Sequence, residues 1–182
     1  MEIGIPWNSL EILGKKPTFG LESSVNVIYT VMAAAEIRRI ASNVETIAIE
    51  HINSMKDIFI SHYIVPKNDV DQLVIELARL LTMKAIDYDI NASIYSPSNV
   101  VDAAWHAILL SPKKYYDLCQ TLLLHNIKDL KVLPNVVIDH DPNGGSYGRR
   151  ERYENSLNRY TELFGELPNS MFWKSVDEET MQ

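Results

Sequence analysis

The sequence predicts a mainly α-helical fold: a single domain of about five to seven helices with one long ordered loop over residues 133–148. Before residue 124, apolar side chains recur mostly at spacings of three and four, and strict alternation is rare. Two prolines and three glycines gather in the predicted loop. Helical periodicity and this concentration of turn-forming residues together predict the fold class.

Three helices are expected in the first half of the chain. The first begins after the serines at residues 23–24, and a second begins at Asn43 as its cap and ends by Pro66. Asp69 followed by Gln72 resembles a capping box and predicts the start of the third. Its inward-facing apolar residues are predicted to be Val70, Leu73, Val74, Leu77 and Leu81.

Three further helices are expected in the second half. Residues 99–109 form the first of them, and the Ser111-Pro112 pair starts the next, with serine as the cap and proline in the first turn. The last covers about residues 149–164 and ends at Gly165.

The whole chain, residues 1–182, is predicted to form one domain with an uneven distribution of motifs. Residues 1–90 form a helical half without a recognised motif, and residues 91–173 carry the patterned segments. We expect residues 174–182 to fray.

Composition narrows the function classes. A formal charge of −7 disfavours binding to nucleic acid or to an anionic membrane surface. The single cysteine, Cys119, excludes an intrachain disulfide and a cysteine-rich zinc module. The most apolar uncharged run, residues 23–35, is too short to span a bilayer, and the start lacks the basic residues of a signal peptide. We therefore expect a soluble cytoplasmic protein.

Asp102 and His106 are the first candidate pair for chemistry. They lie four residues apart on one predicted helix, so they share a face beside Trp105. A carboxylate one turn before an imidazole orients it for general-base catalysis or supplies two metal ligands. The alternative is structural: an aspartate that complements the helix dipole and bonds a partly buried histidine.

A second candidate lies in the predicted loop, where Asp139, His140 and Asp141 precede Asn143 and a glycine pair. The order partly matches a calcium-binding loop, but arginine stands at the twelfth position, where that loop needs a bidentate carboxylate. The alternative is a structural turn. If the loop meets the Asp102 helix, His106 and His140 with Asp139 or Asp141 supply enough ligands for a Zn²⁺ or Fe²⁺ ion.

Arg149, Arg150 and Arg152 form the densest basic cluster in the chain. At a helix N-terminus such a cluster can bind a phosphate or another anionic ligand. The alternative is a solvated first turn of the helix.

The order of short segments in the second half resembles one protein family, the glycine-rich domain-containing protein-like group. The segments that carry the resemblance are Ser96-Pro97, Val101-Asp102 with Trp105-His106, Ser111-Pro112, Tyr115 with Cys119, Asp139-His140-Asp141-Pro142, Arg152-Tyr153, Tyr160 with Phe164-Gly165, Pro168 and Trp173. The resemblance implies a helical module with a cluster of imidazoles. Ile108 and Asp139 stand where many members have histidine.

The leading hypothesis is a non-catalytic interaction or scaffold module with an unknown protein partner and no cofactor. Six residues of the patterned half would form one buried polar network: Asp102, Trp105, His106, His140, Asp141 and Arg152. The alternatives are a metal-dependent hydrolase that holds a divalent ion with His106, His140 and Asp139, and an anion-binding site at the arginine cluster.

Overall fold

The computed structural model describes residues 21–126, 136–140 and 148–180, and side chains within 30–124, 136–140 and 148–179. The described part contains seven α-helices, one 3-10 turn and no strand, which confirms the mainly α-helical prediction. By its contacts the chain divides into two units, Met1–Ala35 and Glu36–Gln182. The hydrophobic core described below lies in the second unit.

Helix α1 (Leu21–Asn53) is continuous, so the predicted break at Asn43 is wrong. No glycine or proline interrupts this stretch. The apolar register also runs on without a shift, because Ala41, Val44 and Ala48 are all buried at spacings of three and four. Asn43 is exposed within the helix, where its side chain has no capping role.

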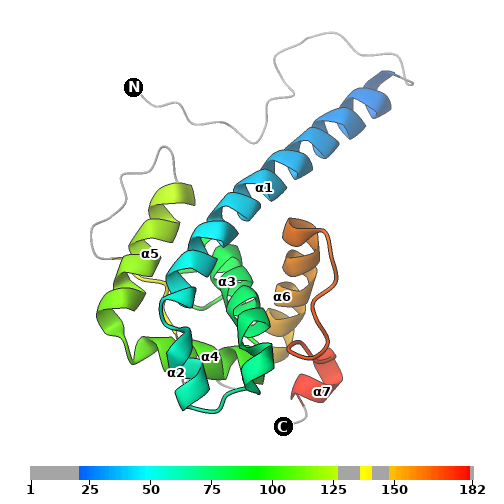
Figure 1. Ribbon diagram of the computed structural model, residues 1–182. Helices are drawn as coiled ribbons and strands as arrows, with labels where there is room; N and C mark the ends of the chain where they lie inside the picture. Colours follow the sequence, from blue (N-terminus) through cyan, green and yellow to red (C-terminus); the bar gives the residue numbers. More distant parts are fainter. Residues whose placement is uncertain (1–20, 127–135, 141–147, 181–182) are drawn as a thin grey trace. The chain divides into compact units, whose positions relative to one another are not determined.

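Helix α3 (Val70–Ile86) lies in the middle of residues 36–182 (Figure 1). It packs against α2 (Lys56–Ser61), α4 (Asn99–Leu109), α5 (Pro112–Asn126) and α6 (Arg149–Phe164). All five predicted inward-facing residues are buried. Asp69 ends the 3-10 turn η1 (Lys67–Asp69) and makes no side-chain capping bond, so the predicted capping box is wrong. Because α3 has neighbours on several sides, polar residues of this helix are buried as well.

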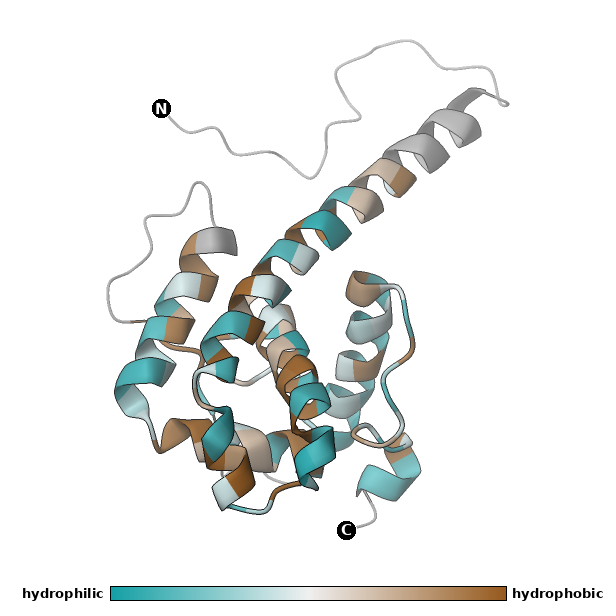
Figure 2. Ribbon diagram, in the orientation of Figure 1, coloured by the Kyte–Doolittle hydropathy of each residue, from teal (hydrophilic) through white to brown (hydrophobic). Residues whose placement is uncertain are grey.

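Helices α4 (Asn99–Leu109) and α5 (Pro112–Asn126) begin where the sequence predicts. The Ser98 hydroxyl accepts a hydrogen bond from the Val101 backbone N–H at 3.2 Å and so caps α4. Figure 2 shows stretches of strongly hydrophobic residues along α3 and α4, where these helices meet their neighbours. The buried side of α4 includes Trp105 and Ile108.

The C-terminal segment is ordered as α7 (Val176–Thr180), so the expectation that residues 174–182 fray is wrong for this stretch. The Ser175 N–H donates to the Glu178 carboxylate at 3.0 Å, and the Glu178 N–H donates back to the Ser175 hydroxyl at 3.4 Å. This reciprocal capping stabilises a short helix. Glu179 is 3% exposed and accepts the first backbone N–H of α4 at 2.5 Å.

Helix α6 (Arg149–Phe164) ends at Gly165, as predicted, and Gly165 adopts the left-handed φ of +74°. We expect Gly165→Ala to lower the free energy of unfolding by about 1–2 kcal/mol, because an alanine Cβ disfavours this conformation. The added Cβ would lie 3.6 Å from Arg38 Nη1, an ordinary contact, so the cost is one of backbone conformation.

Urea denaturation of Gly165→Ala and Gly165→Asn tests this expectation. Asparagine tolerates positive φ better than alanine, so it should cost less. Equal stability of the alanine variant and the wild type would contradict the assigned helix end.

Candidate metal centre

The segment that carries His140 belongs to no helix or strand and lies beside α5 (yellow in Figure 1), and its exposure alternates, with Val137 and Asp139 exposed and Ile138 buried between them. We name residues 136–140 the strap. The Gln120 side-chain amide donates to the carbonyl of Val136 at one end of the strap. Near the other end, the Asp139 N–H donates to the Ile90 carbonyl at 2.8 Å. These bonds attach the strap both to α5 and to the segment that follows α3.

Tyr115 attaches the middle of the strap. Its hydroxyl donates to the carbonyl of Ile138 and accepts a hydrogen bond from Trp105 Nε1 at 3.0 Å. The Ile138 N–H points at the Cys119 sulfur, 3.5 Å away. Burial raises the pKa of the Cys119 thiol, so this sulfur stays a packed, protonated group, as its place on an apolar helix face predicts.

Asp102, His106 and His140 converge in space. One ligand atom from each lies within 4.8 Å of the others. His140 Nε2 is 2.8 Å from Asp102 Oδ1, and His106 Nε2 is 3.9 Å from Asp102 Oδ2. The two imidazole centroids are 4.3 Å apart. Because a carboxylate only accepts hydrogen bonds, Nε2 of His140 carries the proton in this arrangement.

The two cluster residues that α4 supplies, Asp102 and His106, are open to solvent. The side chain of His106 is 52% exposed and that of Asp102 is 34% exposed, whereas that of His140 is 8% exposed. The sequence predicts that these residues form a buried network, and for His106 that prediction is wrong. The reason is geometric, because His106 lies on the outer face of α4, one turn beyond Asp102.

Trp105 contacts the cluster through its ring. Its centroid is 4.7 Å from that of His140, in an edge-to-face arrangement. Its indole N–H is bonded to Tyr115 and not to a cluster residue. Arg152 lies on α6, where its backbone carbonyl accepts the Ser96 N–H at 3.3 Å.

Asp139 is not among the three converging groups, although the metal hypothesis includes it as a ligand. Asp139 is exposed, whereas Ile138 before it and His140 after it are more buried, so its side chain points away from the side that His140 presents to α4. The charge of Asp139 acts on Lys84. Burial lowers the pKa of Lys84, and the negative charges of Asp89 and Asp139 oppose this lowering. The carboxylate that accompanies the two histidines is Asp102. Asp141 lies outside the described residues.

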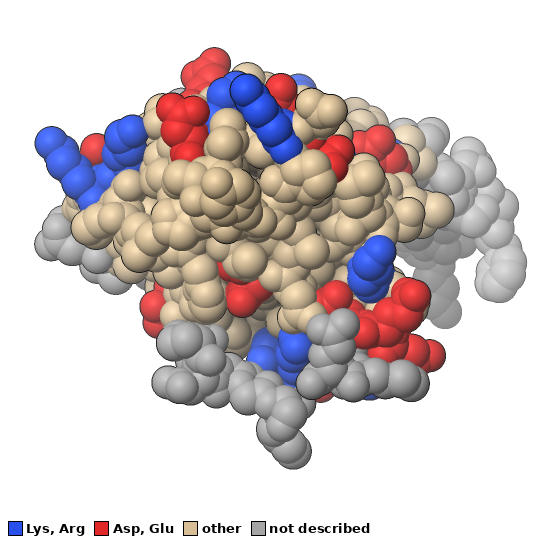
Figure 3. Space-filling model, turned by 60° about the horizontal axis from the view of Figure 1, so that its bottom comes forward, with Lys and Arg blue, Asp and Glu red and all other residues tan. Residues whose placement is uncertain are grey.

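The arginine cluster is engaged with carboxylates of the chain itself. Arg149 is 3.1 Å from Glu179, and Arg150 is 2.9 Å from Asp177. On the face shown in Figure 3, several basic groups lie beside acidic ones. An anionic ligand would have to displace these carboxylates, so the geometry does not favour the anion-binding alternative.

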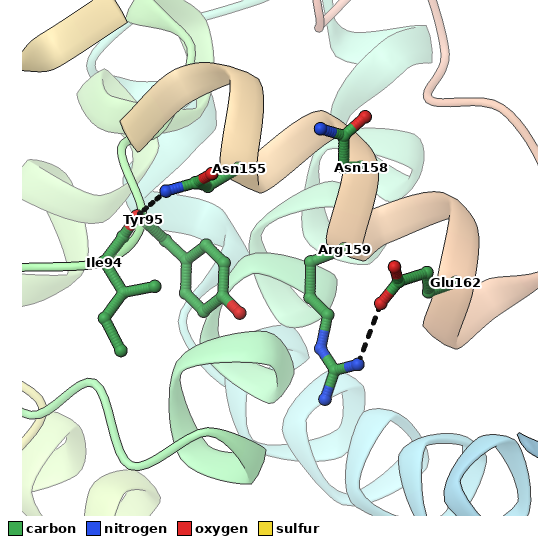
Figure 4. A pocket seen from close by; sticks show the side chains of 6 residues that line it. All are labelled: Ile94, Tyr95, Asn155, Asn158, Arg159 and Glu162. Atoms are coloured by element: carbon green, nitrogen blue, oxygen red, sulfur yellow. Dashed lines mark hydrogen bonds and ion pairs between the residues drawn. The ribbon is translucent and has the colours of Figure 1, made fainter. Parts of the chain in front are cut away.

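A separate shallow pocket of about 310 Å³ lies between α6 and the segment before α4 (Figure 4). Its charged groups are already paired, since Arg159 binds Asp87 at 2.6 Å and Glu162 at 2.9 Å. Asn155 donates to the Ile94 carbonyl across the pocket, at 3.4 Å. No reactive group of the described residues converges there as the histidines do at α4.

Comparison with family models, with curated proteins and with solved structures finds no match for this chain. The resemblance of the second half to the glycine-rich domain-containing protein-like group therefore stays a prediction. Within residues 21–126 and 148–180, no helix is long and apolar enough to cross a membrane.

Proposed function

We propose that the protein binds one divalent transition-metal ion through Asp102, His106 and His140. The observation that supports this proposal is the convergence of two imidazoles and one carboxylate within 4.8 Å. Two of the three side chains are open to solvent, which a purely structural network does not require. The interaction-module hypothesis stays a prediction, with no partner surface assigned.

The observed distances suit a metal after small movements. Two ligand atoms that are each about 2.0–2.1 Å from a tetrahedral ion are about 3.3 Å apart. The separations are 2.8 Å from His140 Nε2 to Asp102 Oδ1 and 3.9 Å from His106 Nε2 to Asp102 Oδ2, on either side of that value. Because they involve different oxygens, the carboxylate must also turn to present one oxygen to both histidines. The half-exposed His106 ring can rotate to close the longer one. The metal would replace the proton on His140 Nε2, so binding should release a proton.

The donor types indicate the kind of ion. Imidazole nitrogen suits zinc, iron, nickel and copper, whereas calcium and magnesium prefer oxygen ligands alone. Three protein ligands leave a fourth tetrahedral position open, which is typical of catalytic zinc sites. An ion held by these three side chains would supply an activated water near neutral pH, chemistry that serves hydrolysis.

His106→Ala tests the proposal with little risk to folding, because the side chain is half-exposed. We expect its Zn²⁺ affinity to fall at least about 100-fold, beyond the 10–100-fold typical of a lost outer-shell partner. The matched control is His62→Ala, which removes another exposed histidine, at the end of α2. This control should bind Zn²⁺ like the wild type.

Competition with a chromophoric chelator measures the affinities, and elemental analysis of protein purified without an affinity tag gives the stoichiometry. If the wild type binds no transition metal, or if His106→Ala binds it equally well, the proposal is wrong. An activated ester then tests for hydrolysis, which should require the loaded protein and be lost in His106→Ala.

A further inference from the structure

Resting on the proposed function, we infer that Tyr115 is a positioning residue for the metal site: it fixes the strap so that His140 meets Asp102 and His106. Tyr115 touches none of the three proposed ligands. It acts through the backbone of the strap and through Trp105.

The Tyr115 hydroxyl joins three elements at one buried point. Its side chain belongs to α5, its donor partner Trp105 belongs to α4, and its acceptor, the Ile138 carbonyl, belongs to the strap. Tyr115 is 6% exposed, and both partners are buried as well. One hydroxyl thus ties the strap to the helix that supplies the other two ligands.

The position of Ile138 determines where His140 can lie. Exposure alternates along the strap: Val137 and Asp139 are exposed, whereas Ile138 is buried and His140 is partly buried, so Ile138 and His140 point to the same side. Ile138 is 0% exposed, so its side chain faces the core, and His140 follows on the same side toward α4. If the Ile138 carbonyl is released, the strap can turn, and the His140 ring loses its fixed direction.

The same tyrosine supports the ring that packs against His140. The Trp105 indole N–H is buried and bonded to the Tyr115 hydroxyl, and the Trp105 ring lies edge-to-face on His140 at 4.7 Å. Burial raises the pKa of Tyr115 far above its usual range, so the hydroxyl keeps its proton and continues to donate to Ile138 at any ordinary pH. Titration of the Tyr115 hydroxyl therefore does not release the strap.

The first measurement needs no metal. In the apo protein, the ¹H–¹³C signal of the His140 ring should be displaced from its random-coil position by the ring current of Trp105. In Tyr115→Phe this displacement should shrink. The matched control is Tyr153→Phe, because Tyr153 is also buried and also donates to a backbone carbonyl, that of Lys174 at 2.9 Å, away from the strap.

The second measurement is Co²⁺ affinity, followed by the absorption of the bound ion. We expect Tyr115→Phe to bind Co²⁺ about 10-fold more weakly than the wild type. Tyr153→Phe should match the wild type. Both affinities, together with a smaller ring-current displacement of the His140 signal in Tyr115→Phe, support the inference.

The two measurements distinguish a failure of the inference about Tyr115 from a failure of the proposed metal binding. An unmoved His140 signal in Tyr115→Phe, or an equal change in Tyr153→Phe, overturns the positioning role whether or not metal binds. Unchanged Co²⁺ affinity in Tyr115→Phe also overturns it. If the His140 signal moves but the wild type binds no metal, Tyr115 positions His140 and the proposed metal function is wrong.

Discussion

Asp89→Ala is expected to lower the free energy of unfolding by about 3–5 kcal/mol, the usual cost of removing one partner from a buried ion pair. Asp89 and Lys84 have side chains that are 0% exposed, and their charged atoms are 2.6 Å apart. The Asp89 carboxylate also accepts from the backbone N–H groups of Ser93, Ile94 and Tyr95 and from the Ser93 hydroxyl at 3.4 Å. The substitution would leave a buried ammonium and these donors without their acceptor.

The loss should depend on pH. Burial lowers the pKa of Lys84 from 10.5, and the Asp89 charge opposes this, so without Asp89 the pKa should fall further. Between that lowered value and 10.5 the unfolded chain binds more protons than the folded one, so the stability of Asp89→Ala rises with pH. The free energy of unfolding that Asp89→Ala loses relative to the wild type should therefore be smaller at roughly pH 10 than at roughly pH 7.

Urea denaturation at both pH values measures the effect, and the chain offers a matched control. Lys56 and Asp71 form an ion pair at 3.2 Å, with side chains 43% and 82% exposed. Asp71→Ala should change the stability by less than about 1 kcal/mol. Lys84→Met in the Asp89→Ala background should recover part of the loss. A deficit no larger than that of Asp71→Ala would mean that the Lys84–Asp89 pair is not buried.

Glu76→Ala is expected to cost about 3 kcal/mol, because it leaves two buried donors without their acceptor. Glu76 is 0% exposed on α3. Its carboxylate accepts the Tyr160 hydroxyl at 3.0 Å and the Trp173 indole N–H at 2.9 Å. The same side chain therefore joins α3 to α6 and to the segment that precedes α7.

Glu76→Gln is the control for this prediction. The glutamine oxygen can still accept from Tyr160 and Trp173, while its amide group faces Gln72, whose own side chain can reverse to accept. We expect a cost of about 1 kcal/mol for glutamine. Equal losses for alanine and glutamine in urea denaturation would contradict the hydrogen-bonding role of Glu76.

Much of the helical structure could be predicted, because it depends on residues close together in the chain. The bounds of α4 and α6 and the start of α5 follow from apolar spacing, from the Ser111-Pro112 pair and from Gly165. The wrong helix predictions concern capping residues. Asn43 can cap a helix but does not have to, and the pairing of Ser175 with Glu178 is a capping signal that the tail prediction missed.

The buried polar residues of α3 were not predicted. Glu76 and Lys84 look like solvated positions of an amphipathic helix. Their burial depends on acceptors or donors that come from α6, from Trp173 and from the turn after α3. Tyr115 stands at helical spacing from the apolar residues Leu118 and Leu122, which favours a buried position without indicating a role. The signal that could have marked it is its hydroxyl, because a buried tyrosine hydroxyl usually needs a partner.

The sequence by itself determined the mainly α-helical class, the helix that carries Asp102 and His106, and the placement of those two residues on one face, because a spacing of four is a local property of a helix. Only the tertiary structure decided that His140 joins them from 38 residues away. It also decided that Asp102 and not Asp139 faces both histidines. The direction of the strap depends on its attachments to Gln120, Tyr115 and Ile90, which no local pattern specifies.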